Sequence, residues 1–157
     1  MKTGYAANTE AAIALTAATA RTIIGVKGNA AFGVDWTGYE IGFDGADATK
    51  VPVLVELCYA TWATNSPGTN SVSSTIRTAY GRAVASGMTA AHAWVAANEP
   101  TVLTPFHEFY LTPNGGLILR EFPRDRTPDS AFAEGFAIRC TAPFGVNARG
   151  GMFFERA

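Results

Sequence analysis

Short segments in which apolar and polar residues alternate are the feature of this sequence that most restricts its fold. A period of two puts successive side chains on opposite faces of an extended strand, so that one face is buried and the other is solvated. Residues 36–44 and 136–141 follow this pattern. In the second segment, Phe136, Ile138 and Cys140 share the apolar face. We therefore expect a fold built from half-buried β-strands.

Two other segments are apolar on both faces, which is typical of strands covered from both sides. Residues 53–59 read VLVELCY, in which one glutamate interrupts the second face. Residues 147–156 place Met152 and Phe154 on one face and Phe153 on the other. The first segment predicts a central strand, and the second predicts the closing strand of the chain.

The stretch FYLTPNGGLILREF joins two apolar runs through Pro113, Asn114 and two glycines. Asn-Gly adopts positive φ at little cost and suits a tight turn. We expect a hairpin in which residues 106–111 pair with residues 117–122 and build one sheet. About seven to nine short strands separated by turns favour an all-β fold, an antiparallel β-sandwich of jelly-roll type.

The remaining segments give weaker patterns. Residues 1–20 are rich in Ala and Thr and are expected to form either an extended N-terminal arm or a first strand. Residues 76–84, which follow two serines that can cap a helix, favour one short helix. Residues 89–97 are ambiguous, and we favour a strand there. No linker divides the rest, so residues 21–157 are expected to form a single sandwich domain.

The charge pattern restricts the partners. Twelve Lys and Arg and thirteen Asp and Glu give a net charge of −1, and the basic residues are scattered along the chain. Phosphate recognition needs a clustered basic face, so no nucleic-acid partner is expected. No apolar stretch approaches the roughly 18 residues of a membrane span, and the start lacks a signal-peptide pattern, so no membrane partner is expected either.

Cys58 and Cys140 each lie in an apolar, strand-like run. No CxxC motif or Cys/His spacing indicates a metal site, and a free cysteine commonly behaves as a small buried hydrophobe. We expect buried thiols in a chain assembled in a cytosol, with a bridge between neighbouring strands as the alternative.

Residues with catalytic potential are few. A zinc or iron site needs several converging ligands, and His92 and His107 are the only histidines. The chain has no GxSxG motif and no complete phosphate-binding loop. Glu40 and Glu56 are candidates for a carboxylate pair across neighbouring strands. Ionic pairing with Arg139 or Arg149 is at least as plausible an alternative. We expect no enzymatic activity, no cofactor and no metal.

The composition is apolar for a chain that must present a surface to water. Hydrophobic residues make up 48% and charged residues 16%. Obligate oligomer interfaces are similarly apolar and poor in charge. We therefore expect apolar side chains to be buried against copies of the same chain, with the candidate contacts Trp62, Trp94, Met152, Phe153 and Phe154. The alternative is a two-layer core with some aromatic side chains under loops.

Three stretches in this order, PVLVELCYATWA, EPTVLTPFHEFYLTPNGGLILREFPRDRTPDS and FAIRCTAPFGVNARGGMFFE, resemble a group of small virion proteins of tailed bacteriophages. The matching motifs lie at residues 52–57, 99–101 and 139–143, and the resemblance covers residues 38–155. It implies a capsid decoration protein that binds the outside of the head as an oligomer, typically a homotrimer, and stabilises the shell. The implied partners are sister copies and the major capsid protein, on the virion surface after synthesis in the bacterial cytoplasm.

Two other functions remain open on the sequence. A tail-tube or tail-terminator subunit would pair with its neighbours through a long loop, and residues 64–74 (TNSPGTNSVSS) would supply one. A carbohydrate-binding β-sandwich would stack sugars on Trp62 and Trp94.

Overall fold

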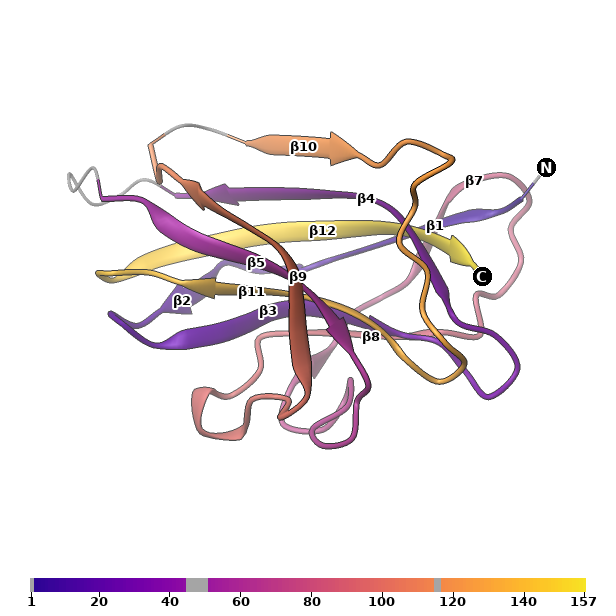
Figure 1. Cartoon of the computed structure of the whole chain (residues 1–157), viewed down its shortest axis with the longest axis horizontal. Coiled ribbons are helices and arrows are strands. Elements are labelled where there is room, and N and C mark those ends of the chain that lie inside the picture. Colours follow the sequence, from indigo (N-terminus) through magenta and orange to yellow (C-terminus); the bar gives the residue numbers. More distant parts are fainter. Residues whose placement is uncertain (1, 45–50, 115–116) are drawn as a thin grey trace.

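The computed structural model describes residues 2–44, 51–114 and 117–157 of the chain. These residues form two antiparallel sheets that pack face to face, so the predicted all-β sandwich is confirmed (Figure 1). The helical structure of the described residues is one short 3-10 turn, η1 (Ala96–Asn98).

Sheet A has the strand order β10-β4-β12-β1-β7, and the short β2 also pairs with β12. Its strands are β1 (Gly4–Asn8), β2 (Ile13–Leu15), β4 (Val34–Phe43), β7 (Arg77–Tyr80), β10 (Ile118–Glu121) and β12 (Val146–Arg156). The central pair is β4 with β12, which run antiparallel along almost their whole length.

Sheet B has the strand order β6-β8-β3-β11-β5-β9. Its strands are β3 (Ala20–Lys27), β5 (Val53–Ala60), β6 (Val72–Ser73), β8 (Thr89–His92), β9 (Leu103–Leu111) and β11 (Gly135–Thr141). In the part of the chain that the structure describes, β9 therefore lies at an edge of sheet B, with β5 on its one paired side.

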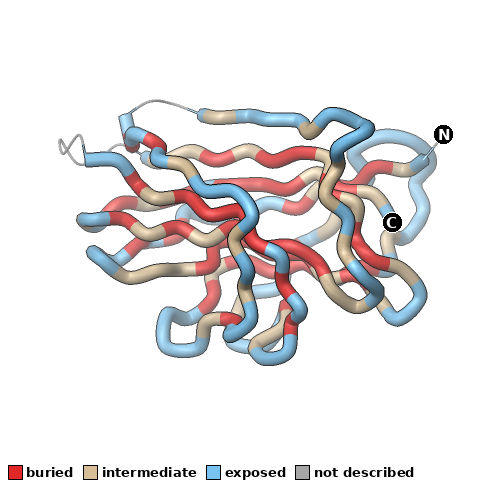
Figure 2. Tube along the Cα trace, in the orientation of Figure 1, coloured by how far each residue is buried: buried red, intermediate tan, exposed pale blue. Residues whose placement is uncertain are grey.

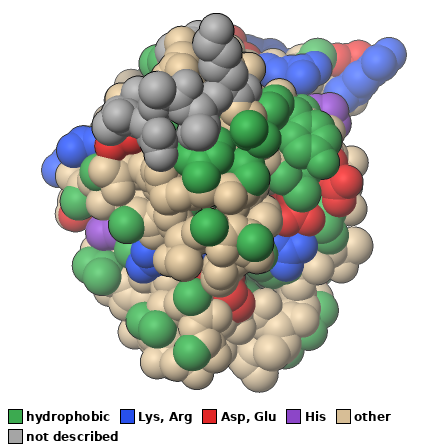
Figure 3. Space-filling model, turned by 90° about the vertical axis from the view of Figure 1, so that its left-hand side faces the viewer, with side chains coloured by type: hydrophobic (Ala, Val, Ile, Leu, Met, Phe, Trp, Pro, Cys, Tyr) green, Lys and Arg blue, Asp and Glu red, His purple; other side chains and the backbone are tan. Residues whose placement is uncertain are grey.

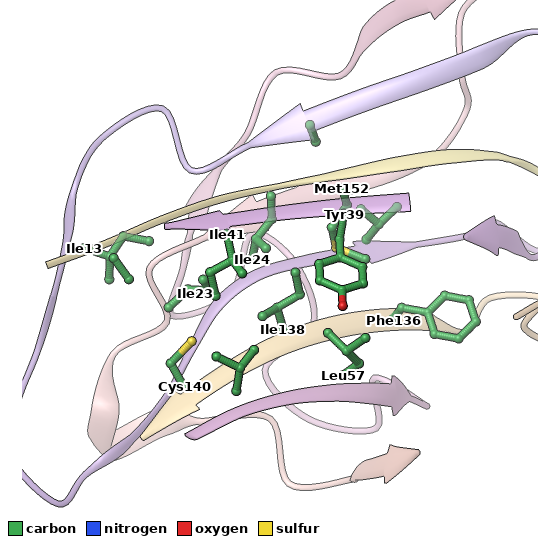
Figure 4. Packing of buried hydrophobic residues seen from close by; sticks show 14 of the residues in the cluster. Ile13, Ile23, Ile24, Tyr39, Ile41, Leu57, Phe136, Ile138, Cys140 and Met152 are labelled. Carbon is green, nitrogen blue, oxygen red and sulfur yellow. The ribbon is translucent and has the colours of Figure 1, made fainter. Parts of the chain in front are cut away.

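The alternating segments form the strands that they predict. Phe136, Ile138 and Cys140 of β11 are buried in the core between the sheets, where Tyr39 and Ile41 of β4 meet them from sheet A (Figure 4). The alternation is visible along the strands in Figure 2, whereas the loops are mostly exposed. A fully buried apolar side chain of this size stabilises the fold by about 1.5–3 kcal/mol.

β5 is buried on both faces, as its sequence predicts. Val55 and Leu57 belong to the core between the sheets. Ala60 belongs to a second, smaller cluster on the outer face of sheet B. In that cluster Trp62 and Trp94 are stacked, with their ring centroids 5.6 Å apart and an interplanar angle of 16°. The two tryptophans therefore act as a cover over the outer face of sheet B.

Segments of the same chain hold this cover in place. The indole Nε1 of Trp94 donates a hydrogen bond of 2.7 Å to the carbonyl oxygen of Asn65. The backbone N–H of Thr22 donates to the carboxylate of Glu99 at 2.9 Å. Gly25 lies beneath the rings, and a Cβ at this position would come within 2.5 Å of the Trp62 ring. The loops that follow β5 and β8 thus cover part of the outer face of sheet B.

The N-terminal residues belong to the sandwich. β1 lies between β12 and β7, and β2 pairs with β12. Tyr5, Ala7, Ile13 and Leu15 are buried in the core. The prediction of an extended N-terminal arm is therefore wrong, and the alternative of a first strand describes residues 4–8. Alternating buried side chains at Tyr5 and Ala7 are the physical reason, since an isolated arm would expose them.

The helix predicted for residues 76–84 is also wrong. Residues 77–80 form β7, which pairs antiparallel with β1. Local propensity in this segment is weak, and pairing with an otherwise open edge of sheet A outweighs it. The strand favoured for residues 89–97 is present in its first half as β8, and η1 follows it.

The predicted hairpin is not formed. β9 pairs with β5 in sheet B, whereas β10 pairs with β4 in sheet A, so the connection between them crosses from one sheet to the other. Gly115 and Gly116 lie outside the described residues. The crossing lets Phe109 of β9 stack on Tyr39 of β4 across the sandwich, with ring centroids 6.2 Å apart. A hairpin would have placed both strands in one sheet and lost this interlayer contact.

Candidate functional site

Four of the five predicted contact residues are buried within this chain. Trp62 is 5% exposed, and Trp94, Met152 and Phe154 are fully buried. Only Phe153 retains partial exposure. The expectation that these four side chains are buried against copies of the same chain is wrong, because the core between the sheets and the cover over sheet B bury them. The alternative of aromatic side chains under loops describes Trp62 and Trp94.

The tryptophans are equally unsuited to stacking on a sugar, since they stack on each other and are both buried. Residues 64–74, which would be the pairing loop of a tail protein, carry internal hydrogen bonds such as Asn70 Nδ2 to Asn65 Oδ1 at 2.7 Å. The Val95 N–H also donates to the carbonyl oxygen of Asn70 at 2.9 Å. This loop is therefore tied to its own chain over part of its length.

The histidines lie on different strands and in different environments. His92 on β8 is buried, and its Nδ1 lies 2.7 Å from the Ser74 hydroxyl. Burial lowers the pKa of His92, and the nearby Glu10 partly offsets the shift. His107 on β9 is exposed, with its ring centroid 5.6 Å from that of Phe109. The described residues contain no group of three or more His, Cys, Asp or Glu that could hold a metal ion.

The two candidate carboxylates lie on opposite sides of the sandwich. Glu40 belongs to β4 of sheet A, and Glu56 belongs to β5 of sheet B. Glu56 accepts two hydrogen bonds from Arg139, of 2.7 and 2.9 Å. The alternative of an ion pair with Arg139 is therefore confirmed for Glu56, and the prediction of a carboxylate pair between Glu56 and Glu40 is wrong.

Glu99 is a polar group that the sequence patterns did not single out. Its carboxylate accepts hydrogen bonds from both the backbone N–H and the hydroxyl of Thr22. Burial raises the pKa of Glu99, and the Thr22 hydrogen bonds act in the opposite direction. Its place in the cover over sheet B indicates a structural role for this carboxylate.

Both cysteines are free and buried, as expected. In register, Cys58 lies opposite Ala137 and Cys140 lies opposite Val55, so the two thiols are not cross-strand partners. Burial raises the pKa of Cys58 to about 12 and also raises that of Cys140. Thiols with such pKa values are poor nucleophiles at neutral pH.

Within the described residues, the outer face of sheet A has no cover comparable to the tryptophan cover of sheet B, and its Glu40, Arg149 and Phe153 are partly or fully exposed. A hollow of about 750 Å³ lies at one end of this face, between β10 on one side and the β1–β2 turn on the other. Its lining includes Glu40, Arg149, Arg77, Asn147 and the exposed Leu117. The side chains of Arg149 and Glu40 make no hydrogen bond or ion pair with other described residues. This end of the face is therefore polar, with opposite charges side by side.

A second hollow, of about 810 Å³, lies at the other end of the same face. Its lining includes Phe153 and Tyr80 together with Phe122. The Phe122 ring also packs on Trp36 and Tyr39 of the core. Lys2 forms ion pairs here with Asp35 at 3.2 Å and Glu155 at 3.5 Å.

A hydrogen bond at this hollow ties β7 to β12. The Tyr80 hydroxyl donates to the Glu155 carboxylate. Burial, followed by this hydrogen bond, raises the pKa of Tyr80 to about 12. Tyr80 is therefore neutral at physiological pH.

Charge is mixed on the rest of the visible surface. Figure 3 shows Lys and Arg side chains interspersed with Asp and Glu on one end of the molecule, without a broad region of one sign. The described part of the chain contains no helix long and apolar enough to span a bilayer.

Comparison of the chain with protein-family models, with curated proteins and with solved structures gives no match.

Proposed function

We propose that this chain is a structural protein of a tailed-bacteriophage virion, a decoration protein that binds the outside of the capsid as a homotrimer. In this role it stabilises the shell by contacts with the major capsid protein and carries out no catalysis. The resemblance of residues 38–155 to such proteins motivates the proposal. The uncovered outer face of sheet A is the structural observation that carries it.

The size of that face is suitable for a protein partner. The ten residues of β4 span about 30 Å, and five strands side by side span about 20 Å, which gives roughly 600 Å². A standard interface buries about 800 Å² on each partner. The face alone would give a modest contact. Many copies on one shell strengthen such a contact through avidity.

The apolar side chains left exposed support association as well. Tyr110, Leu117 and Leu119 are all more than half exposed. β9 also leaves one side of a nine-residue strand unpaired within the described residues. Open edges of this length are sites at which another chain can add. The sandwich thus has a face and an edge that a neighbouring subunit or the shell would cover.

Two measurements test the proposal. Size-exclusion chromatography with light scattering is expected to give a trimer at micromolar concentration. Electron microscopy of the intact particle is expected to place the chain on the exterior of the head. A strictly monomeric species that is absent from the head surface would contradict the proposal, and location in the tail would support the tail-component alternative instead.

A further inference from the structure

The cover over sheet B contains one residue whose backbone and side chain are both in an unfavourable state. Trp62 has a φ of 56°, in the left-handed region that bulky L-residues rarely adopt. Its indole Nε1 is buried and has no hydrogen-bond partner among the described residues. A strained φ and a buried N–H without an acceptor each weaken the closed state of the cover by about 5- to 150-fold. Both costs fall on the same residue.

The other tryptophan of the cover is anchored on sheet B itself. The backbone N–H of Trp94 donates to the carbonyl oxygen of Thr22 at 3.2 Å, and the N–H of Ala93 donates to that of Ile23 at 3.1 Å. Arg21 Nε donates to the carbonyl oxygen of Trp94 at 2.9 Å. The loop that follows β8 is therefore bonded directly to β3.

The loop that carries Trp62, residues 61–71, is hydrogen-bonded to the loop that follows β8. Both loops extend beyond the same end of the sheets (Figure 1). The carbonyl oxygen of Asn65 accepts from Trp94 Nε1 at 2.7 Å, and Asn65 Nδ2 donates to the carbonyl oxygen of Glu99 at 3.1 Å. Separation of the two loops breaks these hydrogen bonds and leaves the strand pairing of sheet B intact.

We propose that residues 61–71 are a lid that opens locally while the sandwich stays folded. In the open state Trp62 leaves its left-handed conformation and its indole N–H reaches water, so both costs are removed. Opening also uncovers the small residues that pack with the rings, Gly25, Ala91 and Ala137. Backbone strain concentrated at one residue in this way is typical of switch regions.

Hydrogen exchange of the indole N–H groups tests the lid, because the chain contains a matched pair. Trp94 and Trp36 are both fully buried, and their Nε1 atoms donate hydrogen bonds of 2.7 and 2.8 Å. The acceptor of Trp94 lies in the lid, whereas the acceptor of Trp36 is Gly38 of β4. By NMR the Trp94 indole is expected to exchange about 100-fold or more faster than the Trp36 indole, since local opening requires less free energy than global unfolding.

A pair of substitutions separates local from global opening. Asn65 and Asn29 are matched, because the Nδ2 of each donates to a backbone carbonyl, at 3.1 and 3.3 Å, and the Oδ1 of each accepts at 2.7 Å. Asn65→Ala is expected to speed exchange of both indoles by about fivefold or more, because the lid contacts are absent from the open and unfolded states alike. Asn29→Ala is expected to speed exchange of Trp36 alone, because its loop stays intact when the lid opens.

Two results would overturn the lid. One is equal exchange of the two indoles in the wild type, and the other is equal acceleration of both indoles by Asn29→Ala. Neither result bears on the proposed function, which concerns the outer face of sheet A and the oligomer.

Discussion

Gly25 shows how a single residue permits the cover over sheet B. An added Cβ would lie 2.5 Å from the Trp62 ring, which is closer than real side chains approach, and a tight 3.1 Å from the Trp94 ring. We expect Gly25→Ala to lower the free energy of unfolding by about 1–3 kcal/mol through overpacking. Urea denaturation followed by tryptophan fluorescence measures this change.

Gly145→Ala is the matched control, because its added Cβ would meet one atom, the Leu15 carbonyl oxygen, at an ordinary 3.9 Å. Its stability is expected to stay within about 0.5 kcal/mol of the wild type, as for most surface substitutions. Equal losses in both variants would show that the tryptophan cover is not tightly packed in solution.

At the scale of strands, Arg139 and Glu56 join β11 to β5. They lie directly opposite each other in the register, and the Glu56 side chain is only 9% exposed. Arg139→Met would leave a mostly buried carboxylate without its partner, and we expect the free energy of unfolding to fall by about 2–4 kcal/mol. The loss is smaller than for a fully buried pair because the arginine is partly solvated. Chemical denaturation compares this variant with the wild type.

The double variant Glu56→Leu with Arg139→Met isolates the cause. It removes the buried charge together with its partner, so it is expected to be more stable than Arg139→Met alone. The single variant Glu56→Leu completes the comparison. If the double variant lost as much stability as Arg139→Met and Glu56→Leu together, the loss would come from packing of the side-chain stems and not from the unpaired charge.

The connection between β9 and β10 shows that the sequence predicts where strands and turns lie but not which strands pair. The alternation predicts both strands, and Asn114 with the glycines after it predicts a reversal of the chain. Neither pattern contains information about which strand lies alongside each one. That choice depends on contacts across the sandwich, such as Tyr39 with Phe109 and Trp36 with Phe106.

For the whole molecule, the N-terminal strands decide whether sheet A is complete. Removal of residues 1–15 would leave β12 and β7 without β1 and would remove three large buried side chains, Tyr5, Ile13 and Leu15. Each contributes about 1.5–3 kcal/mol, and a typical domain has a total stability of only 5–15 kcal/mol. The truncated chain is therefore expected to lose cooperative unfolding, as measured by near-ultraviolet circular dichroism.

Deletion of residues 1 and 2 alone is the control, since it keeps β1 and is expected to keep cooperative unfolding. A chain without residues 1–15 that folded normally and lost only its oligomeric state would instead show that the segment acts as an arm.

The sequence by itself determined that this protein is an all-β sandwich, through its short apolar segments and the turns between them. The period-two pattern also identified the apolar faces of β4 and β11, because the alternation of side chains is a local property of extended backbone. The tertiary structure decided which strands are neighbours and which outer face is covered. Trp62 and Trp94 looked like surface contacts in the sequence and became a buried cover, while Phe153 remained at the surface beside a hollow. Burial on the outer face of a sheet depends on residues distant in the chain that come together only on folding, so no local pattern could assign it.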